Sequence, residues 1–324
     1  MGRHEQVTPA AAQEVRQSSS SILMVEPACF GFNPETAASN CFSSARGGSE
    51  TAQEALREFH GLADRLEAAG VSVFRLKDSL NPPKPDAAFP NNWISFHSDG
   101  TIVTYPMEAP SRRLERRVEE VSSLLGPNFE FRRHVDLSAS EASGEYLEGT
   151  GSLILDRPRA RAYASLSSRT HPRAVAAFDR SLGFSTFTFG ASDPQGRPIY
   201  HTNVLMSLGT RYALLCTDTV AEQDRTALLA DLEQGGRTLI EVDYGQLLSF
   251  TCNIIELADD RGNPLVAMSS AAFRALRQSQ RRLLEELAGE LVHAPIPTIE
   301  AVAGGSVRCM IADIHLPKKG AGAS

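Results

Sequence analysis

The sequence predicts an α/β fold arranged as a five-unit propeller. First, an amphipathic helix, a glycine and a short strand follow one another five times along the chain. Second, the glycines that end these helices recur about every 55 residues, the spacing of a repeated supersecondary unit: Gly70, Gly126, Gly183, Gly235 and Gly289. Third, one strand is left over at each end, Ile22–Val25 and Met310–Ile314. Pairing these two strands would close five αβ units into a ring without a free edge.

The helices are predicted from apolar residues at intervals of three and four. The first contains Ala55, Phe59, Leu62 and Leu66, and the others cover about Ser111–Leu125, a segment opened by Pro172, about Ala221–Glu233, and a segment capped by Ser269 or Ser270 that runs to Leu287. Each helix leads past its glycine into a strand: Val71–Leu76, Phe129–Arg132, Phe184–Phe189, Thr238–Val242 and Leu291–His293.

Strand–turn–strand segments separate these units. The Asp99-Gly100 pair is a strong signal for a hairpin in the first of them. The four predicted strand pairs are Trp93–His97 with Thr101–Tyr105, Ser152–Leu155 with Ala162–Leu166, Val204–Leu208 with Tyr212–Cys216, and Ile254–Leu257 with Leu265–Met268. A doubly wound sheet is the alternative fold, but its long helices and glycine-rich phosphate loop are missing.

We expect a single domain over residues 21–317, because the predicted ring uses strands from both ends of the chain; composition alone would also allow two ordinary domains. With 324 residues, of which 42% are hydrophobic, the chain can bury a large core. Residues 1–20 and 318–324 are predicted to be a disordered N-terminal tail and a flexible C-terminal tail. The net charge is −7 and charges of both signs are interspersed, so neither nucleic acid nor a membrane surface is an expected partner. No apolar run approaches the roughly 20 residues of a membrane span.

The cysteines are widely spaced and form no CxxC pair: Cys29, Cys41, Cys216, Cys252 and Cys309. This pattern fits a reducing, cytoplasmic setting and argues against a disulfide framework or a zinc cage. Because the sequence contains no phosphate loop, haem motif or flavin signature, we expect no cofactor.

Polar residues stand in the loops that lead into the first strand of each hairpin. In a closed radial array these loops face the central axis, so equivalent positions should converge. The residues are Asp86, Asn91, Asn92, Glu148, His201, Asn203, Asn253 and Cys309, joined by Asn33 after the first strand. Each of these residues alone would be an ordinary loop residue, and a lone cysteine is more often buried and inert. Together they provide a thiol, an imidazole and a carboxylate, the parts of thiol-based covalent catalysis.

These motifs resemble the pentein superfamily of enzymes that modify guanidino groups: arginine deiminases, dimethylarginine hydrolases, amidinotransferases and arginine dihydrolases. The resemblance extends from about Ile22 to Pro317, and it rests on the five-unit ring, the Glu148-Gly149-Thr150-Gly151 loop, His201 with Asn203, and the glycines before Cys309. The finer motifs are similar to the citrulline-utilisation hydrolase (CtlX-type) branch: Phe32-Asn33-Pro34-Glu35-Thr36, Phe89-Pro90-Asn91-Asn92-Trp93, His201-Thr202-Asn203 and Gly305-Ser306-Val307-Arg308-Cys309-Met310.

The resemblance implies a cofactor-independent, cysteine-dependent hydrolase of arginine or citrulline side chains. Cys309 would attack the guanidino or ureido carbon and form a thiouronium-type intermediate as ammonia leaves. His201 would protonate the departing nitrogen and later activate water, while Glu148 would support that histidine and hold substrate nitrogens. Arg169 would pair with the substrate α-carboxylate; the alternative is an exposed loop charge.

The sequence departs from the deiminases where two aspartates grip the guanidinium cation. Asn92 and Asn203 match those positions, and an amide can accept from NH2 groups and donate to a carbonyl. This favours a neutral ureido group, with ornithine as the product, and the further substrate-binding candidates are Asn33, Asp86, Asn91 and Asn253. A deiminase or dimethylarginine hydrolase that gives citrulline is the alternative activity. A non-catalytic ribosome-binding factor of the same fold is an alternative of another class.

The remaining polar residues are expected to be structural. No metal-ligand spacing links the histidines His97, His134, His171, His293 and His315. The segment Arg112-Arg113 with Glu115-Arg116-Arg117 is predicted to be a solvated helix face, and Glu26 and Glu256 receive no role. The expected partner is a small arginine-like or citrulline-like substrate, and the oligomeric state is left open, a homodimer included.

Overall fold

The structure, a computed structural model, describes residues 15–37, 39–40, 42–45 and 48–320. Most of the two predicted tails, residues 1–14 and 321–324, lies outside the described residues, as does Cys41. The predicted tail boundary at residue 20 is too late. Gln17 donates from Nε2 to the carbonyl of Leu155 at 2.8 Å, and Ser19 is buried. The boundary at residue 318 is too early, because the Lys319 N–H donates to the Asn128 carbonyl at 2.9 Å.

The described residues form five separate three-stranded sheets. Every middle strand pairs antiparallel with one neighbour and parallel with the other, which confirms the predicted repeat. In the order in which the strands pair, the sheets are β15 (Ala312–Asp313), β1 (Ser21–Glu26) and β2 (Ser72–Lys77); β3 (Ile94–Phe96), β4 (Thr101–Thr104) and β5 (Arg133–Asp136); β6 (Ile154–Asp156), β7 (Arg161–Ser165) and β8 (Ser185–Phe189); β9 (Met206–Leu208), β10 (Tyr212–Leu215) and β11 (Thr238–Glu241); β12 (Ile255–Ala258), β13 (Pro264–Ser269) and β14 (Glu290–Ala294).

The first sheet joins the two ends of the chain. Ile22 of β1 pairs with Asp313 of β15, and Leu23 pairs with Ala312, in antiparallel register. This confirms that the last strand pairs into the first unit. Since the described strands form five small sheets and no single long one, the doubly wound alternative is wrong. No sheet closes on itself within the described ranges.

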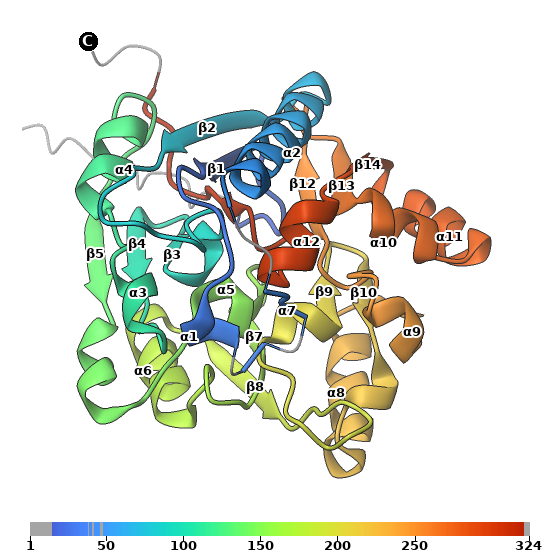
Figure 1. Cartoon of the computed structure of the whole chain (residues 1–324). Coiled ribbons are helices and arrows are strands. Elements are labelled where there is room, and N and C mark those ends of the chain that lie inside the picture. Colours follow the sequence, from blue (N-terminus) through green and yellow to red (C-terminus); the bar gives the residue numbers. More distant parts are fainter. Residues whose placement is uncertain (1–14, 38, 41, 46–47, 321–324) are drawn as a thin grey trace, which may run out of the picture.

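Helices connect the parallel pair of each sheet, as in βαβ units. They are α2 (Ser49–Ala68), α3 (Pro110–Arg113) with α4 (Val118–Leu125), α6 (Pro172–Leu182), α8 (Glu222–Gln234), and α10 (Ser270–Ala275) with α11 (Gln278–Ala288). The shorter helices are α1 (Pro34–Ala37), α5 (Gly149–Ser152), α7 (Thr202–Leu205), α9 (Tyr244–Leu247) and α12 (Pro297–Ala303). In Figure 1 the longer connecting helices surround the molecule, while α1, α5, α7 and α12 lie near its middle.

Two predicted helices are each broken in two. The segment over Ser111–Leu125 breaks between α3 and α4, where Arg117 leaves helical geometry with φ −108° and ψ 61°. The segment that begins at Ser269 breaks at Leu276, which has extended backbone between α10 and α11. Its predicted cap is confirmed, since the Ser269 side chain accepts from the Ala272 N–H at 3.0 Å.

Two predicted strands are displaced or shortened. The strand expected over Phe129–Arg132 begins only at Arg133, because Phe129 and Glu130 pair with the C-terminal segment instead: Phe129 bridges Lys318, and the Glu130 N–H donates to the Pro317 carbonyl at 2.9 Å. The strand expected over Met310–Ile314 is reduced to β15, because the preceding residues form a turn in which Met310 N–H donates to Val307 at 3.1 Å.

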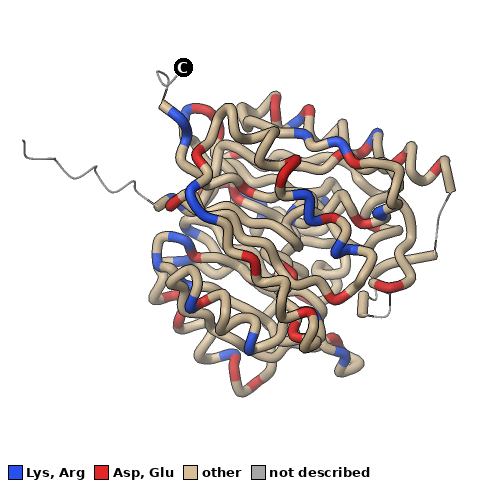
Figure 2. The backbone as a smooth tube through the Cα atoms, turned by 90° about the vertical axis from the view of Figure 1, so that its left-hand side faces the viewer, with Lys and Arg blue, Asp and Glu red and all other residues tan. Residues whose placement is uncertain are grey.

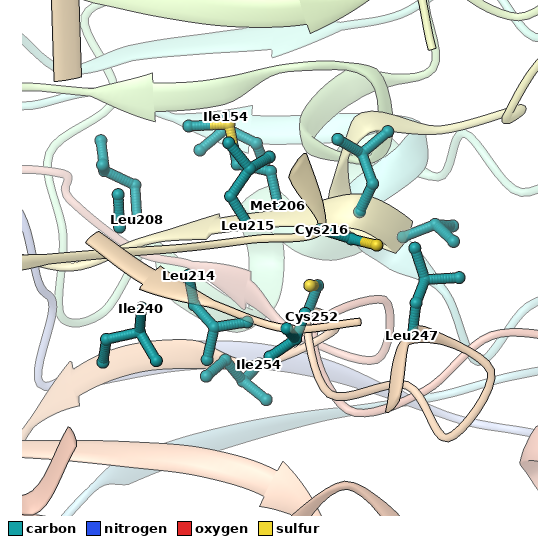
Figure 3. Packing of buried hydrophobic residues seen from close by; sticks show 14 of the residues in the cluster. Ile154, Met206, Leu208, Leu214, Leu215, Cys216, Ile240, Leu247, Cys252 and Ile254 are labelled. Carbon is teal, nitrogen blue, oxygen red and sulfur yellow. The ribbon is translucent and has the colours of Figure 1, made fainter. Parts of the chain in front are cut away.

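Apolar side chains fill the spaces between the sheets and their helices. Figure 3 shows part of the largest cluster, where residues of β9 and β10 meet Ile240 and Ile254. Cys216 and Cys252 belong to this cluster and are fully buried. Burial raises the pKa of Cys216 to about 11 and raises that of Cys252 well above its ordinary value. These two thiols therefore behave as core residues.

Acidic and basic residues are interspersed over the face seen in Figure 2, as the sequence predicts. None of the helices within the described ranges is both long and apolar enough to cross a bilayer.

Candidate active site

Cys309 lies in a turn between α12 and β15. Gly304 ends α12 with a left-handed backbone, φ 65°, and the Cys309 N–H donates to the Ser306 carbonyl at 3.0 Å. A side chain at Gly305 would lie 3.0 Å from the Phe89 ring and 3.5 Å from the Cys309 Cβ. The thiol is 4% exposed and lines a small cavity.

Two asparagine amides hold the sulfur atom of Cys309. Asn253 Nδ2 donates to the sulfur at 3.2 Å, and Asn203 Nδ2 donates to it at 3.4 Å. Asn253 also accepts the Cys309 N–H through Oδ1 at 3.4 Å, and its Nδ2 donates to the Asn203 carbonyl at 3.1 Å. These contacts fix the position of the sulfur atom at the cavity.

His201 and Glu148 form a buried pair beside the cavity. Each directly precedes a short helix, α7 and α5 respectively, so they hold equivalent places in neighbouring units. Nε2 of His201 and Oε2 of Glu148 are 2.9 Å apart. Burial lowers the pKa of His201 to about 4, although the hydrogen bond to Glu148 opposes this change. Burial alone would raise the pKa of Glu148, but Arg169 and His201 lower it well below its ordinary value. The pair is therefore a neutral imidazole with an ionised carboxylate.

Glycine is required at two places in α5. Gly149 has φ +47°, and a Cβ there would lie 2.2 Å from the backbone oxygen of Asn91. A Cβ at Gly151 would lie 2.4 Å from Asn92 Nδ2 and 2.8 Å from His201 Nδ1. The absence of both side chains lets α5 pack directly against the site.

The predicted solvated helix face is wrong for Arg112 and Glu115. Arg112 is 3% exposed and Glu115 is 2% exposed. Glu115 accepts from Arg112 Nε at 3.0 Å and from Nη2 at 2.9 Å, while Arg112 Nη1 donates to Asn92 Oδ1 at 2.8 Å. The charge pattern of the segment suggested a surface because sequence alone does not show that the chain turns inward between α3 and α4.

Arg169 is buried, so it is not an exposed loop charge. Its guanidinium donates to Ser39 Oγ at 2.7 Å, to the Thr36 carbonyl at 2.9 Å and to Glu148 Oε2 at 3.4 Å. The same group lies 4.9 Å from the centre of the Tyr200 ring. Arg169 thus joins the loop around α1 to the His201–Glu148 pair.

Three other predicted residues differ in their distance from the cavity. Asp86 lines it and accepts from Asn33 Nδ2 at 2.7 Å. Asn33 itself does not line the cavity, and its Oδ1 caps α1 by accepting the Glu35 N–H at 3.1 Å. Asn91 is fully buried behind α5, and its backbone oxygen accepts from Thr150 Oγ1 at 3.3 Å.

The cavity at Cys309 is small, about 20 Å³, which is room for about one water molecule. Four polar residues that line it were absent from the sequence-based site: Thr36, Asn40, Arg112 and Tyr200. Tyr200 adjoins His201 in sequence, which is the one signal that could have pointed to it. The charged residues that line the cavity are Asp86, Arg112 and Arg169.

Several residues for which the sequence predicted no catalytic or binding role have hydrogen-bond partners in the structure. Glu256 accepts both the N–H and the hydroxyl of Thr210, and His97 bonds Ser95 at 2.9 Å. His315 bonds Asp313 at 2.9 Å. Glu26 has only a distant ion pair with His60, at 3.9 Å, and nothing in the structure gives it a role.

The arrangement is suited to covalent catalysis by a thiol. A sulfur atom, a neutral imidazole and an ionised carboxylate lie in the segments that lead into three different sheets, and all three side chains are buried. Buried donors and acceptors at the same place can bind a planar group rich in nitrogen.

Comparison with known proteins supports this interpretation of the fold. A family model described as eukaryotic N,N-dimethylarginine dimethylhydrolase matches residues 26–316. No curated protein sequence matches the chain.

Solved structures of similar fold are enzymes of arginine chemistry. The N-terminal domain of ArgZ, an arginine dihydrolase from the ornithine–ammonia cycle in cyanobacteria, superposes with a TM-score of 0.72 at 14% identity, covering 92% of this chain and 98% of that chain. A complex of AgrE with L-arginine gives 0.69 at 16% identity, with 93% and 41% covered. Dimethylarginine dimethylaminohydrolase, as an adduct with S-methyl-L-thiocitrulline, gives 0.65 at 16% identity, with 91% and 99% covered. At these identities the likeness is one of fold.

The fold is thus a mixed α/β fold that matches solved pentein structures, as the sequence predicts. Since the family model covers most of the sequence, the chain belongs, within the pentein superfamily, to the N,N-dimethylarginine dimethylhydrolase family, a family of hydrolases of carbon–nitrogen bonds.

Proposed function

We propose that the protein hydrolyses the ureido or guanidino group of citrulline or arginine and releases ammonia and ornithine, with Cys309 as the nucleophile. The observation that carries this proposal is the contact of two amide NH2 groups with the sulfur of Cys309, next to the His201–Glu148 pair. We also propose that the protein belongs to the CtlX-type branch, which its sequence motifs resemble.

The first chemical step forms a bond between the sulfur of Cys309 and the side-chain carbon of the substrate. His201 takes the thiol proton and transfers it to the departing nitrogen, which leaves as ammonia. The product is a thiocarbamate from citrulline or a thiouronium from arginine. Glu148 stabilises the imidazolium that forms during this step.

The second step returns the free enzyme. His201 removes a proton from water, the water oxygen bonds to the same carbon, and the carbon–sulfur bond breaks as Cys309 regains a proton. From citrulline the product is a carbamate, which loses carbon dioxide to give ornithine. From arginine the product of one cycle is citrulline, which can enter a second cycle.

The charges at the cavity favour a neutral ureido group. Arg112 and Arg169 are cationic, and Asp86 is the one carboxylate among the described lining residues. With Arg169 reserved for the substrate carboxylate, a guanidinium cation would still approach Arg112, whereas a ureido group carries no charge. Amides at Asn92 and Asn203 provide both donors and acceptors for such a group.

The α-carboxylate of the substrate is assigned to Arg169. Its hydrogen bonds to Ser39 can be exchanged for a carboxylate, because Ser39 is half-buried at the edge of the loop around α1. Asp86 would receive the substrate NH groups, and Asn33 would keep Asp86 in place. Asn91 would support the substrate-binding residues from behind α5, where its backbone oxygen accepts from Thr150 Oγ1.

We also propose that the five units form a closed ring. The β1–β15 pair connects the first and last units directly after the nucleophile's turn. We infer that closure of the ring places Cys309 opposite His201.

The family match favours a second candidate, hydrolysis of N,N-dimethylarginine to citrulline and dimethylamine. Incubation with citrulline, arginine and dimethylarginine, followed by assay of ornithine, citrulline and ammonia, separates the two. Ornithine from citrulline supports the first proposal. Citrulline as the sole end product would make the protein a deiminase or a dimethylarginine hydrolase.

A further inference from the structure

A second pocket, of about 390 Å³, lies beside the cavity that contains Cys309, and we call it the outer pocket. Its described lining residues come from four segments: the end of α1 with the loop after it, the loop between β7 and α6, the loop that leads into α7, and the helix α9. Its volume falls within the range of small-molecule sites, about 300–1,000 Å³. The reaction proposed above does not use this space.

The walls of the outer pocket are mainly apolar and are packed against the core. Its large apolar and aromatic lining residues are Phe42, Ile199, Tyr200, Tyr244 and Leu247. Ile199, Tyr200 and Leu247 belong to the largest core cluster, and Phe42 and Tyr244 pack against that cluster. The rings of Phe42 and Tyr200 are 6.4 Å apart between centroids. Walls of this kind suit an apolar or aromatic group.

Tyr200 and Arg169 form the border between the cavity and the outer pocket. Tyr200 lines both spaces. Arg169 lines the cavity, and its guanidinium lies 4.9 Å from the centre of the Tyr200 ring. The same guanidinium donates at 2.7 Å to Oγ of Ser39, which lines the outer pocket. The group assigned above to the substrate α-carboxylate therefore stands at the edge of the outer pocket.

This border determines where the α-end of a substrate lies. The cavity at Cys309 is only about 20 Å³, so it can enclose no more than the reacting end of the side chain. When the carboxylate takes the place of Ser39 on Arg169, the α-carbon lies one bond away from it, at the border. The α-nitrogen is then the remaining substituent other than hydrogen, and the outer pocket is the space that adjoins it.

The outer pocket has no carboxylate ready for a free α-ammonium group. Asp193 is the one acidic residue among its described lining residues. Asp193 already accepts the N–H groups of Gln195 and Arg197, and Arg197 Nε at 2.7 Å. Glu108 lies 3.3 Å from Arg169 Nε but does not line the outer pocket. Because an amide nitrogen carries no charge, an acylated α-nitrogen needs no such partner.

We propose that the outer pocket is a subsite for an apolar acyl group on the α-nitrogen of the substrate, so that the protein binds Nα-acylated citrulline or arginine in preference to the free amino acid. The proposal rests on the proposed function for the position of the substrate carboxylate at Arg169. Such an acyl group occurs in N-acyl amino acids and in peptides that end in citrulline or arginine. Since the subsite touches only the α-end, the preference applies equally to ureido and guanidino substrates.

The test measures binding by calorimetry to the full-length Cys309→Ala variant, which lacks the proposed nucleophile. Nα-benzoylcitrulline should bind at least tenfold more tightly than Nα-acetylcitrulline, because a phenyl ring buries far more apolar surface in the pocket than a methyl group does. The corresponding arginine derivatives should follow the same order. Equal affinities of the benzoyl and acetyl derivatives overturn the proposal. So does tighter binding of citrulline than of Nα-acetylcitrulline, the result expected if a free ammonium group pairs with Glu108.

A dipeptide distinguishes the two sources of the acyl group. Phenylalanylcitrulline carries a phenyl ring on an acyl group, as Nα-benzoylcitrulline does, and adds a free amino group. Both compounds should bind more tightly than Nα-acetylcitrulline, and the tighter of the two identifies a peptide or a simple N-acyl amino acid as the substrate class.

A variant of the pocket wall ties this preference to the outer pocket. Phe42→Ala should lower the ratio of Nα-benzoylcitrulline affinity to citrulline affinity at least fivefold. The matched control is Phe187→Ala, since Phe187 is also half-buried against the same core cluster but does not line the outer pocket. An equal change of the ratio in both variants overturns the proposal.

Failure of the subsite and failure of the proposed reaction give different results. If the wild-type protein releases ornithine from citrulline but binds no acylated derivative more tightly than citrulline, the reaction stands and the subsite is wrong. If Nα-benzoylcitrulline binds tightly and selectively but no substrate is converted, the reaction is wrong and the subsite stands.

Discussion

Nε2 of His201 lies 2.9 Å from Oε2 of Glu148, and both residues directly precede the short helix that opens a hairpin. The contact is a product of the repeat, since the two residues hold equivalent positions in neighbouring units. The carboxylate fixes the imidazole so that Nε2 carries the hydrogen and Nδ1 is free to exchange a proton.

Glu148→Gln should lower kcat for citrulline by roughly 10²-fold or more, with little change in KM. Glutamine preserves the shape of the side chain but removes the charge that stabilises the imidazolium. Steady-state kinetics with ornithine detection checks this, and Glu145→Gln, which removes an ion pair with the exposed Arg173, is the control. A comparable loss in the control, or a change confined to KM, would contradict the assigned role of Glu148.

The repeat made most of this site predictable from sequence. Cys309, His201 and Glu148 were predicted together because each stands in the same position of its unit; in the structure Cys309 and His201 line one cavity, and His201 contacts Glu148. Arg112 and Glu115 were missed because a charged segment between two helices has the same pattern whether it faces solvent or the interior. Only tertiary packing decides which occurs.

The sequence also left element ends uncertain, for a related reason. The strand after Cys309 contains five consecutive residues of suitable type, yet only Ala312 and Asp313 pair with β1. The turn that positions the thiol uses the residues before them, and such a turn has no strong signal of its own.

The acid limb of kcat/KM for citrulline should have an apparent pKa near 4. Burial lowers the pKa of His201 to about 4, and the neutral imidazole is the form that accepts the thiol proton. Activity on this account rises with pH through that limb and no longer depends on His201 toward neutrality. A limb at the ordinary histidine value of 6.5 would show that burial does not depress this pKa.

The free energy of unfolding should also depend on the protonation of His201. The folded protein binds fewer protons at His201 than the unfolded chain between pH 6.5 and about 4, so the contribution of His201 to stability falls as pH drops through this window. Unfolding midpoints measured alongside the kinetics distinguish loss of fold from titration of the imidazole.

Gly151→Ala should lower kcat/KM for citrulline at least tenfold, because the added methyl group would meet both Asn92 and His201 below 3.0 Å. Neither side chain can move freely, since each is buried and hydrogen-bonded. The control is Gly61→Ala in α2, where a Cβ meets nothing within 4 Å and where alanine should stabilise the helix by roughly 0.5–1 kcal/mol. Equal activity of Gly151→Ala and wild type would show that the site tolerates a side chain there.

A chain that ends at Thr298 should lose both activity and cooperative folding. It lacks Cys309 and β15, and it lacks apolar residues buried in the adjoining cluster, among them Ile299, Val302 and Met310. A chain that ends at Gly320 retains every described residue and is the control. Thermal unfolding of the shorter chain at the full-length midpoint would count against closure of the ring.

The most direct test of the account is the mass of the protein during turnover of citrulline. After rapid acid quenching, we expect an increase equal to citrulline minus ammonia, located on the peptide that contains Cys309 and absent from Cys309→Ala. Ornithine and ammonia should appear at the same time. Undiminished ornithine production by Cys309→Ala would contradict covalent catalysis by this thiol.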